Sequence, residues 1–364
     1  MCRAFVWLSV IFILCSLSVA AAAQSTINVP ADQPTIQAAI NAANNGDTVV
    51  VAPGTYIENL NFKGKFITVT SSGGPAVTIV DGGGAGPVVI FDTNEGANSV
   101  LNGFTLQNGV PALFFPIEGL SGGGILILNA SPTIANNIIT GNHAICGIGI
   151  EIEGGSAVIR GNTITGNTQA GGDGGCGGGG IEVTGDSSHP ATPQITGNTI
   201  TNNSLAGGGF GGGIEVSYFA SPTIQNNYIA GNSVYNSGGG IDLSSYLAPV
   251  VVQNIIVNNS AGAGGSGGGI NLLAGSEAAD EVANNTIVGN TAFDRSSGSA
   301  RKCFPPLRSA ITSWWRRPGR TESSAALSAQ HSPPSRTTTS YRRGPAGRRG
   351  RTAPTRTRAT AISR

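Results

Sequence analysis

The sequence predicts an all-β solenoid, in which short strands stack coil upon coil, on three observations. A twelve-residue segment recurs six times without gaps, and a glycine-rich motif that ends in isoleucine recurs between the copies. Short β-branched runs bounded by Gly, Asn, Ser and Thr replace the long periodic segments of helical proteins. Glycine accounts for 56 of 364 residues, which is well below the one third that a collagen helix requires.

The recurring segment marks one coil, because a unit this short buries its apolar face only against its neighbours. The copies begin at Ser131, Ser156, Thr192, Ser221, Ala248 and Ala279 and close on Asn142, Asn167, Asn203, Asn232, Asn259 and Asn290. Amide side chains at equivalent turns can donate and accept hydrogen bonds from coil to coil. We therefore expect stacked asparagine ladders.

The glycine-rich motif marks a corner of each coil. It ends at Ile125, Ile150, Ile181, Ile214, Ile241 and Ile270, and an alternating apolar strand follows. We expect the glycines to provide the positive φ of a sharp corner. Each coil is therefore predicted as corner, strand, turn and strand.

One short helix is expected ahead of the first coil. Ile36, Ala39, Ile40 and Ala43 fall on one helical face, and Thr35 is a suitable N-cap residue. Such a helix would cover the open end of the solenoid, which otherwise exposes unpaired strand edges.

These repeats and the stretch that opens the chain resemble the pectin-lyase-like superfamily over about residues 26–293. The resemblance implies a right-handed parallel β-helix with a short N-terminal capping helix. The segment Gly54 to Glu58 reads Gly-Thr-Tyr-Ile-Glu and matches the Gly-x-Tyr-x-Glu motif of pectin methylesterases, which shapes the first coils. The catalytic motifs of pectin methylesterases and of polygalacturonases are absent.

The ends of the chain differ in composition from the repeats. Residues 1–23 have the basic start, the apolar run and the small residues of a secretory signal peptide, so we expect a secreted or cell-surface protein without a membrane span after cleavage. The solenoid is expected over residues 24–294. Residues 295–364 are rich in Arg, Ser, Thr and Pro and are expected to be disordered, either as a genuine basic tail or as a frameshift product.

The charge of the solenoid limits its partners. Residues 24–294 hold 18 acidic and three basic residues, which gives a net charge of 3 − 18 = −15. Such a body repels phosphate backbones and suits cations or neutral polymers. We expect a monomer that binds no nucleic acid.

Four acidic residues follow the corner isoleucines of successive coils. They are Glu151, Glu182, Glu215 and Asp242, and in a parallel stack they should form an outward column with a spacing of about 4.8 Å. Three interpretations are open. The acids form a solvated face, they bind polysaccharide or a divalent cation such as Ca²⁺, or alternate protonation equips them for acid–base catalysis.

The predicted function is that of an exported β-helix protein that binds polysaccharide or a divalent cation along this acidic face without catalysis. The alternative is a polysaccharide lyase or glycoside hydrolase of the superfamily. Pectate lyases pair calcium-binding acids with an arginine base, and Arg160 is the only arginine of the body. Glu182, Glu215 and Arg160 are the catalytic candidates of this alternative.

Other residues of interest lie in loops and turns. Cys146 and Cys176 precede corners of adjacent coils, where they could form a disulfide or remain stacked thiols. His143 and His189 fall at different corners, which gives a paired metal site no support. Tyr218, Tyr228, Tyr235 and Tyr246 occur within two coils, near Phe210 and Phe219, and either line a sugar-binding groove or pack in turns.

Overall fold

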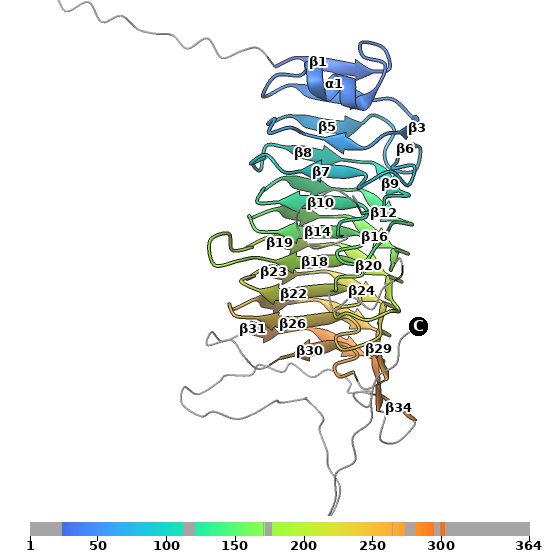
Figure 1. The fold of residues 1–364 in the computed structure, drawn as a ribbon, viewed down its shortest axis with the longest axis vertical. Coiled ribbons are helices and arrows are strands. Elements are labelled where there is room, and N and C mark those ends of the chain that lie inside the picture. The colour runs from blue at the N-terminus through green and yellow to red at the C-terminus, as the bar shows by residue number, and fades with distance from the viewer. Residues whose placement is uncertain are drawn as a thin grey trace, which may run out of the picture. The chain divides into compact units, whose positions relative to one another are not determined.

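The described part of the chain is a stack of parallel coils. The computed structural model describes residues 24–111, 121–169, 171, 177–263, 265–273, 281–294 and 299–302. Successive coils lie one on another in chain order (Figure 1). The predicted signal peptide and residues 303–364 lie outside the described residues.

The strands form four sheets, numbered here in the order in which the chain meets them within a coil. Sheet I contains β4 (Leu60–Asn61), β7 (Val89–Phe91), β10 (Ile125–Leu128), β14 (Ile150–Glu153), β18 (Ile181–Thr184), β22 (Ile214–Tyr218), β26 (Ile241–Ser245) and β30 (Ile270–Leu272). Sheet II contains β1 (Thr26–Val29), β2 (Thr48–Val51), β5 (Thr68–Ser71), β8 (Val100–Asn102), β11 (Thr133–Ala135), β15 (Val158–Arg160), β19 (Gln194–Thr196), β23 (Thr223–Gln225), β27 (Val250–Val252) and β31 (Glu281–Ala283).

Two further sheets complete the coil. Sheet III contains β3 (Gly54–Ile57), β6 (Thr78–Asp81), β9 (Thr105–Gln107), β12 (Ile138–Thr140), β16 (Thr163–Thr165), β20 (Thr199–Thr201), β24 (Tyr228–Ala230), β28 (Ile255–Val257) and β32 (Thr286–Val288). Sheet IV contains β13 (His143–Ala144), β17 (Thr168–Gln169), β21 (Ser204–Leu205), β25 (Ser233–Val234), β29 (Ser260–Ala263), β33 (Thr291–Asp294) and β34 (Ser299–Lys302). The predicted all-β parallel solenoid is confirmed, with four strands per coil where the sequence indicated two.

Strand β34 differs from the other strands. It pairs antiparallel with β33, whereas the strands of the stacked coils pair in parallel. These four residues belong to the segment that we expected to be disordered, and they extend sheet IV instead.

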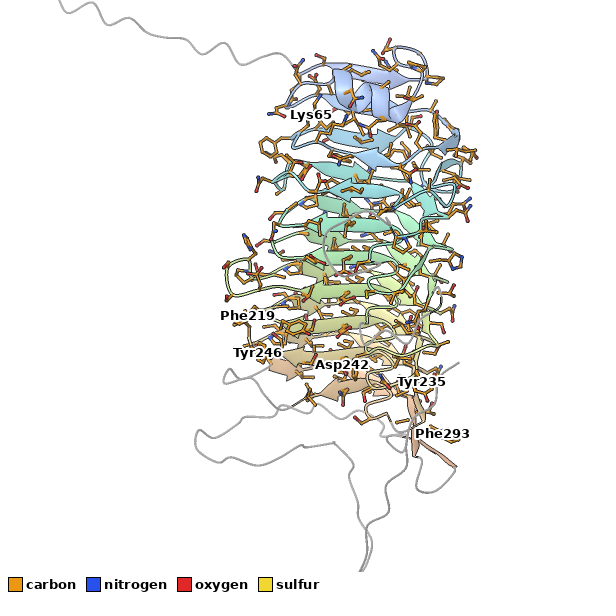
Figure 2. The ribbon with its side chains drawn as sticks, in the orientation of Figure 1. Lys65, Phe219, Tyr235, Asp242, Tyr246 and Phe293 are labelled. Carbon is orange, nitrogen blue, oxygen red and sulfur yellow. The ribbon has the colours of Figure 1, made fainter. Side chains whose placement is uncertain are left out.

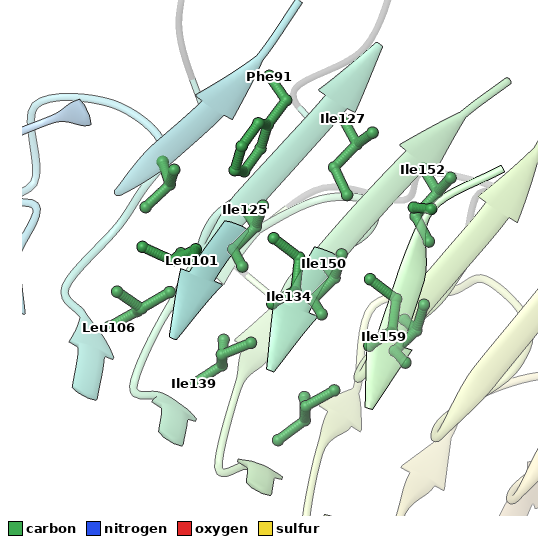
Figure 3. Packing of buried hydrophobic residues seen from close by; sticks show 14 of the residues in the cluster. Phe91, Leu101, Leu106, Ile125, Ile127, Ile134, Ile139, Ile150, Ile152 and Ile159 are labelled. Carbon is green, nitrogen blue, oxygen red and sulfur yellow. The ribbon is translucent and has the colours of Figure 1, made fainter. Parts of the chain in front are cut away.

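Alternation along the strands places isoleucine in the core. Ile150 and Ile152 of β14 point inward and are fully buried, as are Ile159 of β15 and Ile164 of β16. Equivalent side chains of adjacent coils stack in rows along the interior (Figure 3). Because each coil contributes a few apolar residues to one continuous column, no coil buries its apolar surface alone.

Asparagine ladders line the core at two turns. The closing asparagines form one ladder, in which the Nδ2 of each residue donates to the Oδ1 of its counterpart in the next coil, as Asn167 does to Asn203 at 2.9 Å. This ladder confirms the prediction. A second ladder, which the sequence analysis did not separate from the first, contains Asn137, Asn162, Asn198, Asn227, Asn254 and Asn285.

The glycine corners provide both the positive φ that the sequence predicts and space for close backbone contacts, which it does not predict. The first glycine of the triplet has the expected positive φ, as at Gly178 (φ 70°). The third glycine has an ordinary φ, and it is required because a side chain there would clash with the next coil. A Cβ on Gly180 would lie 2.6 Å from the carbonyl oxygen of Gly213 and 2.7 Å from Cγ2 of Ile200.

Helix α1 (Ile36–Ala42) forms where predicted and packs on the first coil. The Thr35 hydroxyl accepts a hydrogen bond from the Ala38 N–H at 3.1 Å. The Glu58 carboxylate accepts the N–H groups of Ile36 and Gln37 at 3.0 and 2.9 Å, so the last residue of the Gly-x-Tyr-x-Glu motif stabilises the helix N-terminus.

Lys65 secures the other end of α1. Its ammonium donates to the carbonyl oxygens of Ile40, Asn41 and Ala43, each at 2.7 Å. We expect Lys65→Met to lower the free energy of unfolding by about 1–3 kcal/mol, because helix-end carbonyls lose a charged donor. Urea unfolding would measure this loss. Lys63→Met, which removes a single bond to Asn41, is the matched control, and an equal loss there would contradict the role of Lys65.

Candidate functional site

Acidic side chains form a column on sheet I. The acidic column consists of Glu151, Glu182, Glu215 and Asp242, which are paired in register from strand to strand. Leu126 occupies the same position in the preceding coil, and Asn271 occupies it in the following one. The predicted stacking is therefore confirmed.

The column is buried, which excludes a solvated acidic face, one of the three interpretations of the sequence. The exposed fractions are 1% for Glu151, 6% for Glu182, 5% for Glu215 and 1% for Asp242. The side chains do leave sheet I on the side opposite the core, as the inward positions of Ile150 and Ile152 require. A second layer of chain covers them there.

That layer is made by the glycine-rich loops that connect sheet IV to sheet I. We call the described segments 145–149, 177–180, 210–213, 237–240 and 266–269 the roof. Successive loops of the roof are hydrogen-bonded to one another: the N–H of Gly147 donates to Gly177 O, that of Gly178 to Phe210 O, both at 3.0 Å, and that of Gly211 to Ser237 O at 3.1 Å.

Glycine is required in the roof because carboxyl groups fill the space beneath it. A Cβ on Gly147 would lie 1.9 Å from Oε2 of Glu151, and a Cβ on Gly177 would lie 1.7 Å from Oε2 of Glu215. The glycine runs that mark the corners in the sequence therefore also accommodate the column.

Burial dominates the electrostatics of the column. It raises the pKa of Glu151 and of Glu215 well above the usual value, with a further contribution from the Glu182 charge. Burial also raises the pKa of Glu182 to about 7, although hydrogen bonds from Glu151 and from the backbone of Gly147 and Gly177 act in the opposite direction. Burial raises the pKa of Asp242 to about 6 against the effect of its hydrogen bond from Asn271.

The polar contacts of the column are incomplete. Asp242 accepts a hydrogen bond from Nδ2 of Asn271 at 2.7 Å, and the Asn271 side chain accepts one from Ser266 at 2.7 Å. Glu151 and Glu182 share a hydrogen bond between their carboxyl groups. One oxygen of each glutamate, Oε2 of Glu151, Glu182 and Glu215, is buried without a partner.

The described residues contain no group of three or more His, Cys, Asp or Glu side chains with the geometry of a metal site. The column runs as a line along the stack, whereas Ca²⁺ gathers six to eight oxygens around a point. Calcium binding by the column therefore stays a prediction.

A family comparison agrees with this architecture. The family model for the right-handed β-helix region matches residues 117–303, which is about half of the chain and includes the acidic column. The chain belongs to the right-handed β-helix family. No curated protein and no solved structure matches it significantly.

Arg160 does not join the column of this right-handed β-helix protein. It is the last residue of β15 in sheet II, where it is paired with Ala135 and Thr196, whereas the column lies on sheet I. Its side chain is exposed. The lyase arrangement, in which Arg160 faces Glu182 and Glu215, is therefore not formed, because the arginine lies on a different sheet.

The histidines of the β-helix lie apart, as expected. His143 is exposed on sheet IV, and its Nδ1 is 2.9 Å from the Thr168 hydroxyl. His189 lies in the loop between β18 and β19, where its Nδ1 is 3.2 Å from Oδ2 of Asp186.

Cys146 lies in the roof of the β-helix and is disulfide-bonded. Cys176, the partner expected from the sequence, lies outside the described residues. Among the described residues no helix has the length and apolar character needed to cross a membrane.

The aromatic residues of the β-helix separate into different faces. Tyr228 lies on sheet III and Tyr235 follows sheet IV, whereas Tyr218, Phe219 and Tyr246 gather at the corner between sheets I and II. Figure 2 shows Phe219 and Tyr246 together and Tyr235 away from them. Phe210 lies in the roof. Of the two interpretations of these tyrosines, a groove lined by all four is therefore not formed, and three aromatic residues cluster at one corner.

Two sequence signals could have revealed the burial of the column. Leu126 at the first column position marks an apolar environment on the outer side of sheet I. The glycine-rich segments ahead of the strands of the column mark a close approach of backbone to side chain.

Proposed function

We propose that this protein is an exported, non-catalytic β-helix that binds a neutral polysaccharide through an aromatic corner. The corner patch consists of Asp186, His189, Tyr218, Phe219 and Tyr246. The observation that supports it is the exposed aromatic cluster between sheets I and II. The acidic column is covered by the roof and therefore offers no surface to a polymer.

Geometry favours stacking of sugar rings on this patch. Tyr218 and Tyr246 are 59% and 53% exposed, and their ring centroids are 6.4 Å apart. The ring of Phe219 lies 5.4 Å from that of Tyr246 at an angle of 60°. Rings held edge to face leave faces free for the apolar side of a sugar, and the tyrosine hydroxyls remain available as donors.

The backbone holds Tyr218 in an unusual conformation. Its φ is 52°, and apart from Lys63 and Gln253 every other non-glycine residue with positive φ in the described chain is asparagine. Its carbonyl oxygen accepts hydrogen bonds from the Tyr246 N–H and the Ser245 hydroxyl, both at 2.7 Å. A bulky residue in the left-handed region costs about 1–3 kcal/mol, and such strain concentrates at binding sites.

Polar groups border the aromatic cluster. The loop that contains Asp186 and His189 lies beside Phe219, whose N–H donates to Gly185 O at 3.3 Å and whose O accepts from the Ala191 N–H at 3.0 Å. Both side chains are exposed and pair with each other. Carboxylate and imidazole groups can bind sugar hydroxyls next to the stacking surface.

The net negative charge of the solenoid favours a neutral polysaccharide over an acidic one. The solenoid contains 18 acidic residues against three basic ones, a balance of −15 that repels a polyuronate at low ionic strength. The predicted signal peptide supports export, and the disulfide at Cys146 is consistent with an oxidising compartment.

Calorimetry with soluble neutral hexasaccharides, and with polygalacturonate as the acidic comparison, tests this proposal. We expect Tyr218→Ala and Tyr246→Ala each to weaken the neutral ligand at least about tenfold, because exposed aromatic anchors dominate such contacts. Tyr228→Ala, which removes a 43% exposed tyrosine from sheet III, is the matched control. Equal losses in all three variants, or preference for polygalacturonate, would reject the aromatic corner.

A further inference from the structure

The acidic column lacks any positive partner in the described structure. The basic residues of the described chain up to Asp294 are Lys63 and Lys65 beside α1 and Arg160 on sheet II. A buried carboxylate without a counter-charge costs several kcal/mol. Four carboxyl groups in adjacent coils therefore need either protons or a cation.

Every group of the described chain that faces the column is neutral or acidic. The described roof segments contain glycine, serine, Ile145, Ile148, Phe210 and the disulfide-bonded Cys146, and Asp173 of the second loop lies outside the described residues. Glu153 of β14 is the neighbouring charge on the same sheet and raises the pKa of Glu151 and Glu182 by repulsion. His143 is exposed on sheet IV and bonds to Thr168.

The contacts along the column alternate. Glu182 accepts a hydrogen bond from Glu151 and from the backbone of Gly147 and Gly177, and Asp242 accepts one from Asn271. Both residues thus have donors that stabilise a charge. Oε2 is buried without a partner in all three glutamates, but in Glu151 and Glu215 it lies against a glycine of the roof, and neither of these two residues accepts a backbone N–H as Glu182 does. These two groups have the environment of a neutral carboxylic acid.

We propose that the column binds protons in alternation, with Glu151 and Glu215 neutral and Glu182 and Asp242 ionised. These protons make the folded protein more stable at acidic than at alkaline pH. Neutral Glu215 separates the charges of Glu182 and Asp242 by one coil, and neutral Glu151 supplies the proton of the hydrogen bond to Glu182. The roof closes over the column because two of its four groups are uncharged.

The direction of the pH dependence follows from the raised pKa values. In the unfolded chain these acids titrate near 4.5 and 3.8, whereas in the folded chain the pKa of Asp242 is about 6, that of Glu182 is about 7, and those of Glu151 and Glu215 are raised well above their usual value. Folding therefore takes up protons above about pH 4. The stabilisation is complete below the unfolded pKa and is lost as the pH rises through the folded values.

Urea unfolding of the full chain from pH 5 to pH 9, in the presence of EDTA, tests the proposal. Wherever Glu151 and Glu215 remain protonated in the folded chain and ionised in the unfolded one, each releases one proton on unfolding, so together they should lower the folding equilibrium constant about 100-fold per pH unit. The Glu151→Gln/Glu215→Gln double variant keeps the size and donor capacity of the neutral acids and should lose this slope. Glu281→Gln, at an exposed position on β31, should retain it.

A second measurement applies even if the double variant does not fold. Infrared spectra of the native chain with ¹³C-labelled glutamate should contain a protonated carboxyl band at pH 8. Absence of that band, or a stability that rises with pH, would overturn the proposal. Stabilisation by added Ca²⁺ that EDTA reverses would also overturn it, because a cation would then neutralise the column in place of protons.

Discussion

Replacing Asn198 by leucine is expected to destabilise the protein by about 3–6 kcal/mol, the largest effect of any single side chain considered above. Asn198 is 1% exposed and lies in the middle of the second asparagine ladder. Its Oδ1 accepts the backbone N–H and the Nδ2 of Asn162 at 2.9 and 3.1 Å, and its Nδ2 donates to Ile159 O at 2.9 Å. Leucine leaves the buried Asn162 N–H without its acceptor and removes one hydrogen bond each from Asn162 Nδ2, Ile159 O and Asn227 Oδ1. An unsatisfied buried polar group costs about 1–3 kcal/mol.

The comparison for this change is a turn asparagine outside the ladder. Asn226 is exposed and has a φ of 56°, so Asn226→Gly is expected to change the free energy of unfolding by less than about 0.5 kcal/mol. Urea midpoints of both variants, measured at pH 5, decide the question. A loss below about 1 kcal/mol for Asn198→Leu would mean that the ladder contributes little to stability.

The Gly180→Ala substitution is expected to lower the free energy of unfolding by about 3 kcal/mol, because the added methyl group overpacks the contact between coils. The added Cβ would meet a backbone oxygen of the next coil at 2.6 Å and the Nδ2 of Asn203 at 3.1 Å, and neither group can move without disturbing a ladder. Because φ at Gly180 is ordinary, this cost arises from space and not from backbone conformation.

Gly86 provides a matched site without that crowding. A Cβ there meets only Nδ2 of Asn59 at 3.8 Å, so Gly86→Ala should leave stability unchanged or raise it by up to about 1 kcal/mol. Differential scanning calorimetry would separate the two variants. Similar unfolding temperatures for the two variants would show that the coils can move apart to accommodate a methyl group, which would contradict the overpacking of Gly180→Ala.

The stacking direction of the fold follows from the sequence alone. Equivalent isoleucines and asparagines at intervals of one coil determine the register, because a slip would place Ile150 outside and Glu151 in the core. Helix α1 was predictable from Thr35 and its apolar face. The fourth sheet was not, since strands of two residues such as β13 and β21 are too short for a periodic pattern.

The environment of the candidate site was harder to infer than its register. Alternation along β14 correctly places Glu151 opposite the core, but it does not tell whether another layer lies there. The roof is mostly glycine with scattered apolar residues such as Ile148 and Phe210, so no hydrophobic periodicity in the sequence predicts it. The position of Arg160 depends on which of several sheets a turn leads into, which local spacing does not determine.

The coil-to-coil bonding described above also makes the protein modular. In each sheet a strand of the stack bonds only to the strands of the coils before and after it. The six repeat copies start 25 to 36 residues apart, yet the register of Ile134, Ile159 and Ile195 is unbroken. The additional residues of the longer coils therefore lie in the loops. A whole coil can therefore be duplicated or lost during evolution without redesign of the remaining ones, so the length of the acidic column and the character of the corner patch can evolve independently.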